Sequence, residues 1–161
     1  QGRNCDGRCG EMFAAGGYRV GRFDNRDTGL SSKFEERTYA LRGMADDAVT
    51  VLDAVKAERA HVMGVSMGGM IAQRLAIDHR DRLLSLTSVM SRTGEPEYGQ
   101  SSPEALAVLM AKPARTRDEY VDNQIAGKRV FGSTPEWIDE PYLRARAALA
   151  FDRCYCPAGS G

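Results

Sequence analysis

Short apolar runs alternate with longer segments in which apolar residues recur every three or four positions. The recurring spacing predicts helices over residues 44–60 and 67–79. Short runs without that spacing predict three strands, at residues 18–24, 61–66 and 83–89. Strands that alternate with helices in this way are typical of a parallel sheet with crossover helices, so we expect an α/β fold.

The charges and glycines within these segments refine the prediction. Asp46 and Asp47 near the start of the first helix, with Lys56 and Arg59 near its end, suit the helix dipole. Gly21 weakens the strand at residues 18–24, because a glycine packs poorly on a sheet.

The strand pattern stops after residue 94, and three helical segments follow. Their predicted starts are Ser102 with Pro103, Thr116 with Glu119 as a capping box, and Thr134 with Pro135. We therefore expect residues 1–94 to form a partial sheet core, residues 95–153 a helical layer on the sheet, and residues 154–161 a tail that is cut short.

Length and charge narrow the class of protein. At 161 residues the chain suits one domain, and 22 basic against 22 acidic residues leave no net charge that would favour nucleic acid or an anionic membrane. The longest apolar run, residues 105–111, is far shorter than the ~18 residues of a membrane span. We expect a soluble, cytoplasmic protein whose partner is a neutral small molecule, and its oligomeric state is left open.

The four cysteines form one close pair near each end of the chain. They are Cys5 with Cys9, and Cys154 with Cys156. Neither spacing matches the C-x2-C pattern that zinc sites prefer, so we expect reduced thiols rather than a metal site or a terminal disulfide.

A serine lies between glycines where the second predicted strand meets the next helix, in the segment "GVSMGGM". Strand, G-x-S-x-G and helix together place a serine hydroxyl on a sharp turn above a sheet, which makes Ser66 a candidate nucleophile. Side chains at Gly64 and Gly68 would crowd this turn, and Gly69 lets the helix start close to neighbouring groups. The N–H of Met67, at the start of the helix, is then the natural donor to an oxyanion.

A glycine-rich turn of a nucleotide-binding fold is the structural alternative. The glycines stand at positions 64, 68 and 69, which fits neither G-x-G-x-x-G nor the phosphate-binding loop pattern. The spacing therefore favours the nucleophile turn.

Residues 64–91 resemble the nucleophile strand, helix and following strand of the α/β-hydrolase family. The segment "RFDNRDTGLSS" is similar to the loop after the preceding strand in bacterial ester hydrolases of the anthracycline methyl esterase kind. The resemblance extends from about Glu11 to the end and implies an esterase without cofactor, in which residues 95–153 form a helical cap. It also implies that the chain is truncated at both ends.

The same resemblance implies a triad of serine, acid and histidine in that chain order. The acid and histidine are expected beyond Gly161 and are thus absent here, as is a second oxyanion loop. His61 precedes Ser66 on the same strand by ~16 Å, and His79 lies ~20 Å away along the helix, whereas a general base must come within about 3 Å of the hydroxyl. We expect both histidines to be structural.

Acidic residues do follow the predicted strands. Asp24 and Asp27 follow the first and Glu95 the last, but an acid without an imidazole to orient achieves little. We expect Asp24, Arg26 and Asp27 to form a salt-bridged loop, with a tight turn at Gly29.

The apolar residues of the helical layer are expected mainly to pack, with one or two lining an apolar substrate pocket. They are Leu106, Leu109, Met110, Val121, Ile125, Phe131 and Trp137. The sequence thus predicts a carboxylic ester hydrolase acting through an acyl-enzyme at Ser66, inactive or weak at this length. The alternative is a non-catalytic fragment of the fold that binds a small ligand or a partner.

Overall fold

The computed structural model describes residues 7–34, 39–132 and 134–154. Within them the chain divides into two compact units, residues 1–26 with 33–99, and residues 27–32 with 100–161. Each unit is described by itself below.

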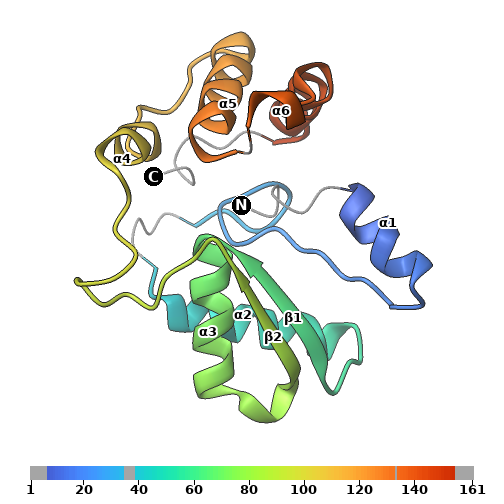
Figure 1. Cartoon of the computed structure of the whole chain (residues 1–161). Coiled ribbons are helices and arrows are strands. Elements are labelled where there is room, and N and C mark those ends of the chain that lie inside the picture. The colour runs from blue at the N-terminus through green and yellow to red at the C-terminus, as the bar shows by residue number, and fades with distance from the viewer. Residues whose placement is uncertain (1–6, 35–38, 133, 155–161) are drawn as a thin grey trace. The chain divides into compact units, whose positions relative to one another are not determined.

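The first unit is built on two parallel strands. β1 (Ala60–Val65) pairs with β2 (Leu83–Val89), with a bulge between Ala60 and His61. Helix α3 (Met67–Asp78) connects them, followed by the short 3-10 turn η1 (Arg80–Arg82). The carboxyl ends of both strands and the start of α3 lie at the same end of this unit (Figure 1). A β-α-β unit of this kind brings residues at that end together.

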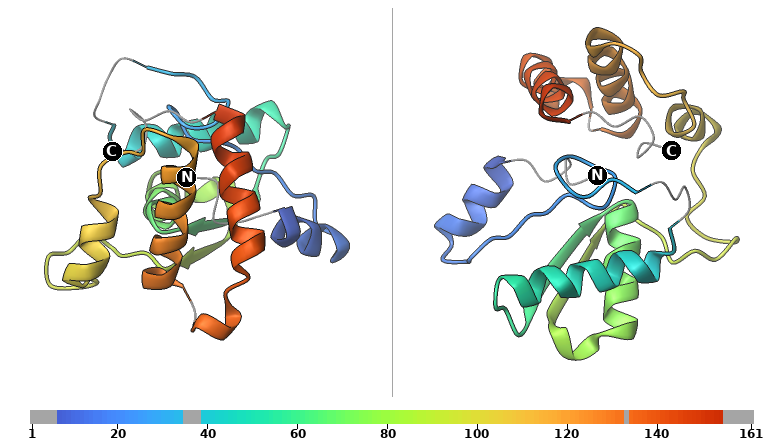
Figure 2. Two further views of the ribbon diagram at one scale, coloured as in Figure 1. Left: turned by 90° about the horizontal axis from the view of Figure 1, so that it is seen from above. Right: turned by 180° about the vertical axis from the view of Figure 1, so that it is seen from behind.

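Two helices cover one face of the strand pair. α3 packs on both strands and α2 (Leu41–Ala54) packs on α3, as both views in Figure 2 show. The core between them consists of Met44, Ala45, Ile71, Leu75 and Leu83. Leu75 is almost fully buried, so the apolar face of α3 predicted by its spacing is the face that packs.

The predicted strand at residues 18–24 is wrong. This segment has no regular secondary structure, and Tyr18, Val20 and Phe23 are exposed. A strand exists only when its N–H and C=O groups find a neighbouring strand, and among the described residues the sheet has only β1 and β2. The local β propensity of residues 18–24 was therefore not enough to make them a strand.

The helix predicted over residues 44–60 is shifted towards the amino end. α2 ends at Ala54, and Lys56 adopts a positive φ of 55°, which stops the helix. Arg59 thus lies outside the helix and donates to the carbonyl of Leu83 at 3.2 Å. The expected match of Lys56 and Arg59 to the helix dipole is therefore wrong. A helix that the sequence did not predict, α1 (Gly7–Ala15), precedes these elements.

The second unit has helices and no strand among its described residues. It contains α4 (Pro103–Leu109), α5 (Arg117–Phe131), the 3-10 turn η2 (Pro135–Trp137) and α6 (Glu140–Cys154). α5 packs on both α4 and α6, and a cluster of Ala114, Tyr120, Val121 and Ala147 forms its core.

The helix caps explain where these helices begin. The Ser102 hydroxyl accepts from the N–H of Ala105, and the Thr116 hydroxyl accepts from the N–H of Glu119 at 3.2 Å, as the sequence predicts. The third start is wrong: α6 begins at Glu140, because the carboxylate of Asp139 accepts from the N–H of Tyr142 at 3.0 Å. Pro135 begins only the short turn η2.

The apolar residues of this unit differ in burial, and Phe131 is half-buried. Val121 and Ile125 are buried in the helical core, which confirms the packing role expected for them. Four others are exposed, namely Leu106, Leu109, Met110 and Trp137. No helix in the described parts of the chain is long and apolar enough to cross a membrane.

Candidate active site

Ser66 occupies a strained turn between β1 and α3. Its backbone adopts φ 56° and ψ −125°, a region that residues other than glycine rarely populate. Three backbone hydrogen bonds hold it there: the N–H of Ser66 donates to the carbonyl of Val89 at 2.9 Å, and its carbonyl accepts from the N–H groups of Gly69 at 2.8 Å and Met70 at 3.3 Å. The abrupt turn that the sequence predicts at this serine is present.

The neighbouring glycines differ in the space that is available for a side chain. A methyl group at Gly64 would overlap the backbone carbonyl of Gly68, so only glycine fits at position 64. A methyl group at Gly69 would lie 2.5 Å from Cβ of Ser91 and 2.7 Å from Oγ of Ser88. At Gly68, by contrast, a methyl group would meet nothing within 4 Å, so the crowding predicted there is wrong.

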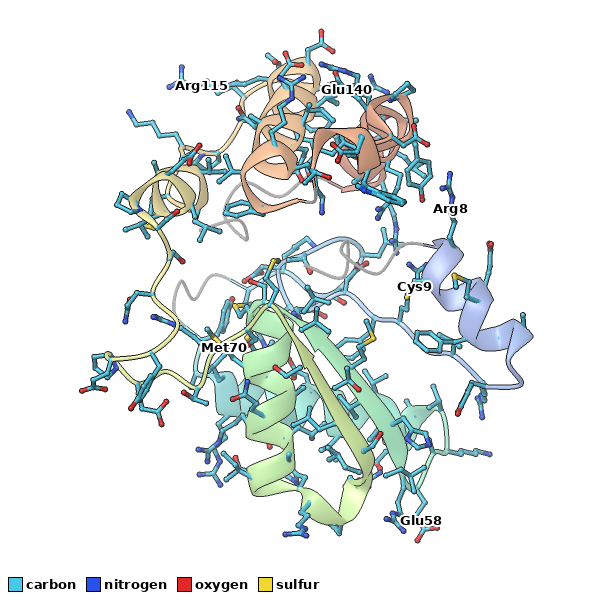
Figure 3. The ribbon with its side chains drawn as sticks, viewed as in Figure 1. Arg8, Cys9, Glu58, Met70, Arg115 and Glu140 are labelled. Carbon is cyan, nitrogen blue, oxygen red and sulfur yellow. The ribbon has the colours of Figure 1, made fainter. Side chains whose placement is uncertain are left out.

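The first turn of α3 presents backbone donors next to the serine. Met67 is the first helical residue, and among the described residues no backbone carbonyl accepts from its N–H. A helix start carries a partial positive charge, which favours a negative charge that develops close by. Met70, one turn into the helix, marks this end of α3 in Figure 3.

Both histidines are engaged elsewhere. Nδ1 of His61 lies 2.8 Å from the hydroxyl of Ser85, and Tyr18 packs edge-on against the imidazole at 5.9 Å. Nε2 of His79, just after α3, lies 2.8 Å from a carboxylate oxygen of Asp46 on α2. The structural roles that the sequence predicts for these histidines are present.

The acidic loop has a partner on α2 that the sequence did not predict. Arg26 forms a two-pronged salt bridge to Asp47 of α2, with both N–O distances 2.8 Å. Its guanidinium also lies 5.3 Å from the ring of Phe34 and 5.1 Å from that of Tyr39. Arg26 thus ties the loop to α2 through a residue that the sequence assigned to the helix dipole.

The turn beside this loop agrees with its prediction. Asp27 has a φ of 61° and its N–H donates to the carbonyl of Ser32 at 2.9 Å, while Gly29 has a φ of 50°. Glu95, after β2, accepts from the hydroxyl of Thr93 and is exposed. Glu95 has no hydrogen bond to a histidine among the described residues.

The terminal cysteine pairs fall mostly outside the described residues. Cys5 and Cys156 lie there, and so does the side chain of Cys154. In the described parts of the chain, no three His, Cys, Asp or Glu side chains gather as a metal site requires.

One side chain near the serine went unnoticed in the sequence. Gln73, on α3, donates to the hydroxyl of Ser88 near the end of β2 and to the backbone carbonyl of Arg92, three residues beyond that end. Its position seven residues after Ser66, two helical turns away, was the only available signal.

Comparisons with known proteins point to one protein family. Residues 7–134 match the model of the alpha/beta hydrolase fold. Rhodomycin D methylesterase DauP of Streptomyces sp. (strain C5) is 32% identical, with 87% of this chain and 54% of the relative covered. A protein of Caulobacter vibrioides (strain NA1000 / CB15N), provisionally named carbamate hydrolase RutD, is 45% identical, with 80% of this chain and 45% of the relative covered.

A solved structure has the same arrangement of elements. The enol-lactonase from Burkholderia xenovorans LB400 superposes with a TM-score of 0.58 at 25% identity, covering 85% of this chain and 49% of that one. The chain therefore spans about half the length of the relatives that it matches.

Proposed function

Because the chain belongs to the α/β-hydrolase fold family, we propose that it forms the nucleophile-bearing part of a hydrolase that cleaves carboxylic esters, with Ser66 as the nucleophile. The observation that carries the proposal is the backbone of Ser66, held at φ 56° between the end of a strand and the start of a helix. Such strain is costly and is retained where it places a reactive group.

The proposed chemical step is transfer of the acyl group to Ser66. Oγ of Ser66 attacks the ester carbonyl carbon and gives its proton to a general base, and the carbonyl oxygen becomes an oxyanion. The N–H of Met67 donates to that oxyanion. Collapse of the intermediate expels the alcohol, which takes up the proton, and water then releases the acid and regenerates the serine.

The general base is the missing part of this mechanism. His61 and His79 are held by Ser85 and Asp46, so neither is placed to take the proton of Ser66. We therefore propose that the 161-residue chain on its own is inactive or weakly active. The helices of residues 95–153 form the proposed cap, and a cytoplasmic location stays a prediction from the sequence.

The names of the relatives suggest the bond that is cleaved. One is a methylesterase, one is provisionally named a carbamate hydrolase, and one is an enol-lactonase. All three names describe attack on an acyl carbon that bears an oxygen or nitrogen leaving group. Small neutral carboxylic esters are thus the proposed substrate class.

A covalent probe tests the nucleophile directly. We expect a fluorophosphonate, whose phosphorus is far more electrophilic than an ester carbonyl, to label the wild-type chain at Ser66 slowly even without the general base, at a site located by mass spectrometry of the labelled peptide. Ser66→Ala should lose the label, while Ser85→Ala, a serine bonded to His61 on β1, should keep it. Labelling that persists in Ser66→Ala would contradict the proposed role.

A non-catalytic role is the second candidate, and it is favoured by the engagement of both histidines away from the serine. It predicts that a folded sample shows no labelling at Ser66 and yet binds a small ester or a partner protein. Circular dichroism of the same sample establishes that the chain is folded.

A further inference from the structure

The side chain of Gln73 joins α3 to the end of β2. Its Nε2 donates to Oγ of Ser88 at 3.2 Å and to the backbone carbonyl of Arg92 at 3.3 Å. A carbonyl oxygen can only accept, so the amide must present its NH2 group to this segment. One side chain thus bridges both ends of the segment 88–92.

Residues on one side of α3 contact segment 88–92 at three successive positions. Ser66, Gly69 and Gln73 are spaced by three and four positions and therefore lie on one side of the helix. Ser66 donates to the carbonyl of Val89, Gly69 packs against Ser88 and Ser91, and Gln73 bonds Ser88 and Arg92.

The contact of Gly69 with Ser88 and Ser91 is packing alone, without a hydrogen bond among the described residues. The hydroxyl of Ser91 is buried and has no hydrogen-bond partner in the described parts of the chain. The absence of a side chain at Gly69 sets how closely segment 88–92 approaches α3, and the amide of Gln73 holds the segment at that distance.

We propose that Gln73 is a positioning residue for the nucleophile, acting through segment 88–92. By holding this segment against α3, it keeps the Val89 carbonyl within reach of the Ser66 N–H and so maintains the strained turn. The inference rests on the proposed function of Ser66 for its catalytic consequence, but the effect on the turn does not depend on it.

Two measurements on the same variants test the proposal. Gln73→Met keeps the length of the side chain and removes the donor, and Gln73→Glu replaces the donor by an acceptor. Arg74→Met is the matched control, because Arg74 is the next residue of α3 and pairs with Asp78 instead of segment 88–92. The readouts are the rate of fluorophosphonate labelling at Ser66 and hydrogen exchange of the Ser66 amide.

We expect both Gln73 variants to slow labelling about tenfold, since a small misplacement of a reacting group costs one to two orders of magnitude. The Ser66 amide should exchange faster than in the wild type, whereas Arg74→Met should change neither value. Wild-type exchange of the Ser66 amide in both Gln73 variants would overturn the inference. If the wild type is not labelled at all, the proposed function fails, and the exchange data alone decide the role of Gln73.

Discussion

At the scale of single residues, the turn at Ser66 depends on what its neighbours lack. The carbonyl of Gly68 occupies the space where a side chain of residue 64 would stand, and Ser88 and Ser91 occupy the space beside Gly69. The strain at Ser66 persists because its N–H and C=O are both bonded. The three glycines look equivalent in the motif, but only Gly64 and Gly69 lie where a side chain would clash.

Two alanine substitutions separate these glycines. Gly64→Ala should lower the free energy of unfolding by about 1–3 kcal/mol, because its methyl group must displace backbone atoms. Gly68→Ala should instead stabilise the chain by about 0.5–1 kcal/mol, because alanine favours the helix and meets no neighbour. Urea unfolding followed by circular dichroism measures both, and equal destabilisation by the two variants would contradict the geometry.

At the scale of elements, α5 and α6 are joined by pairs of charged groups. Arg117 bonds both carboxylate oxygens of Asp152, at 2.8 and 2.9 Å. Arg144 bridges Asp122 on α5 and Glu140 on α6, each at 2.9 Å. The hydrogen bond from Arg117 lowers the pKa of Asp152, and hydrogen bonds from Arg144 and then Arg129 lower that of Glu140.

These shifts predict how the stability of α5 with α6 depends on pH. A carboxyl with a lowered pKa in the folded state stabilises fully above its ordinary pKa, about 3.9 for Asp, and this stabilisation is lost as the pH falls through the folded value. We expect the free energy of unfolding to fall on acidification below about pH 4. The effect should be small, because all these groups are exposed to solvent.

The variant Arg117→Met tests the source of that pH dependence. It should reduce the loss of stability between about pH 5 and 2, because Asp152 then titrates alike in both states. Lys128→Met is a control on α5, the helix of Arg117, at a basic residue outside the Arg117–Asp152 pair. An unchanged pH profile in Arg117→Met, measured by urea unfolding at each pH, would count against the pair.

The cap of α5 is a separate element-scale prediction. Thr116→Ala should cost about 1 kcal/mol, because the N–H of Glu119 loses its acceptor. Thr116→Ser keeps a hydroxyl and should retain most of the stability. Thermal unfolding of the two variants side by side gives the comparison, in which equal melting temperatures would show that the cap does not stabilise α5.

At the scale of the whole molecule, the first unit leaves apolar sheet surface uncovered within the described residues. Met63 and Val89 alternate away from the face that packs on α3 and are 45% and 39% exposed, while Leu84 is 50% exposed. The described sheet has two strands, so both its outer edges lack a strand neighbour there. Exposed apolar edges are templates for association with other chains.

The isolated chain should therefore self-associate as its concentration rises. Met63→Lys combined with Val89→Lys should suppress this, because charges on the sheet face oppose pairing. Ile77→Lys is the control, since Ile77 is an apolar residue on α3, away from the sheet face, and is even more exposed, at 71%. Size-exclusion chromatography with light scattering reports the mass, and a monomer at every concentration in the wild type would contradict the prediction.

The elements that the sequence predicted well are those whose signals are local. The bounds of β2, the start of α3, the caps at Ser102 and Thr116 and the sharp turn at Ser66 all agree with the structure. Each depends on residues within a few positions of one another, such as a hydroxyl three residues before the N–H that it caps. The roles of Ser66 and Met67 in catalysis stay predictions.

The features that the sequence did not predict depend on contacts between residues far apart along the chain. The segment 18–24 has strand propensity but no strand to pair with, and Arg26 selects Asp47 because α2 brings it within reach. Gln73 meets Ser88 only once β2 lies beside α3. The sequence by itself determined the strained serine turn, because its sterics are local. The tertiary structure alone decided what holds that turn, because hydrogen bonds between distant segments form only after the chain has packed.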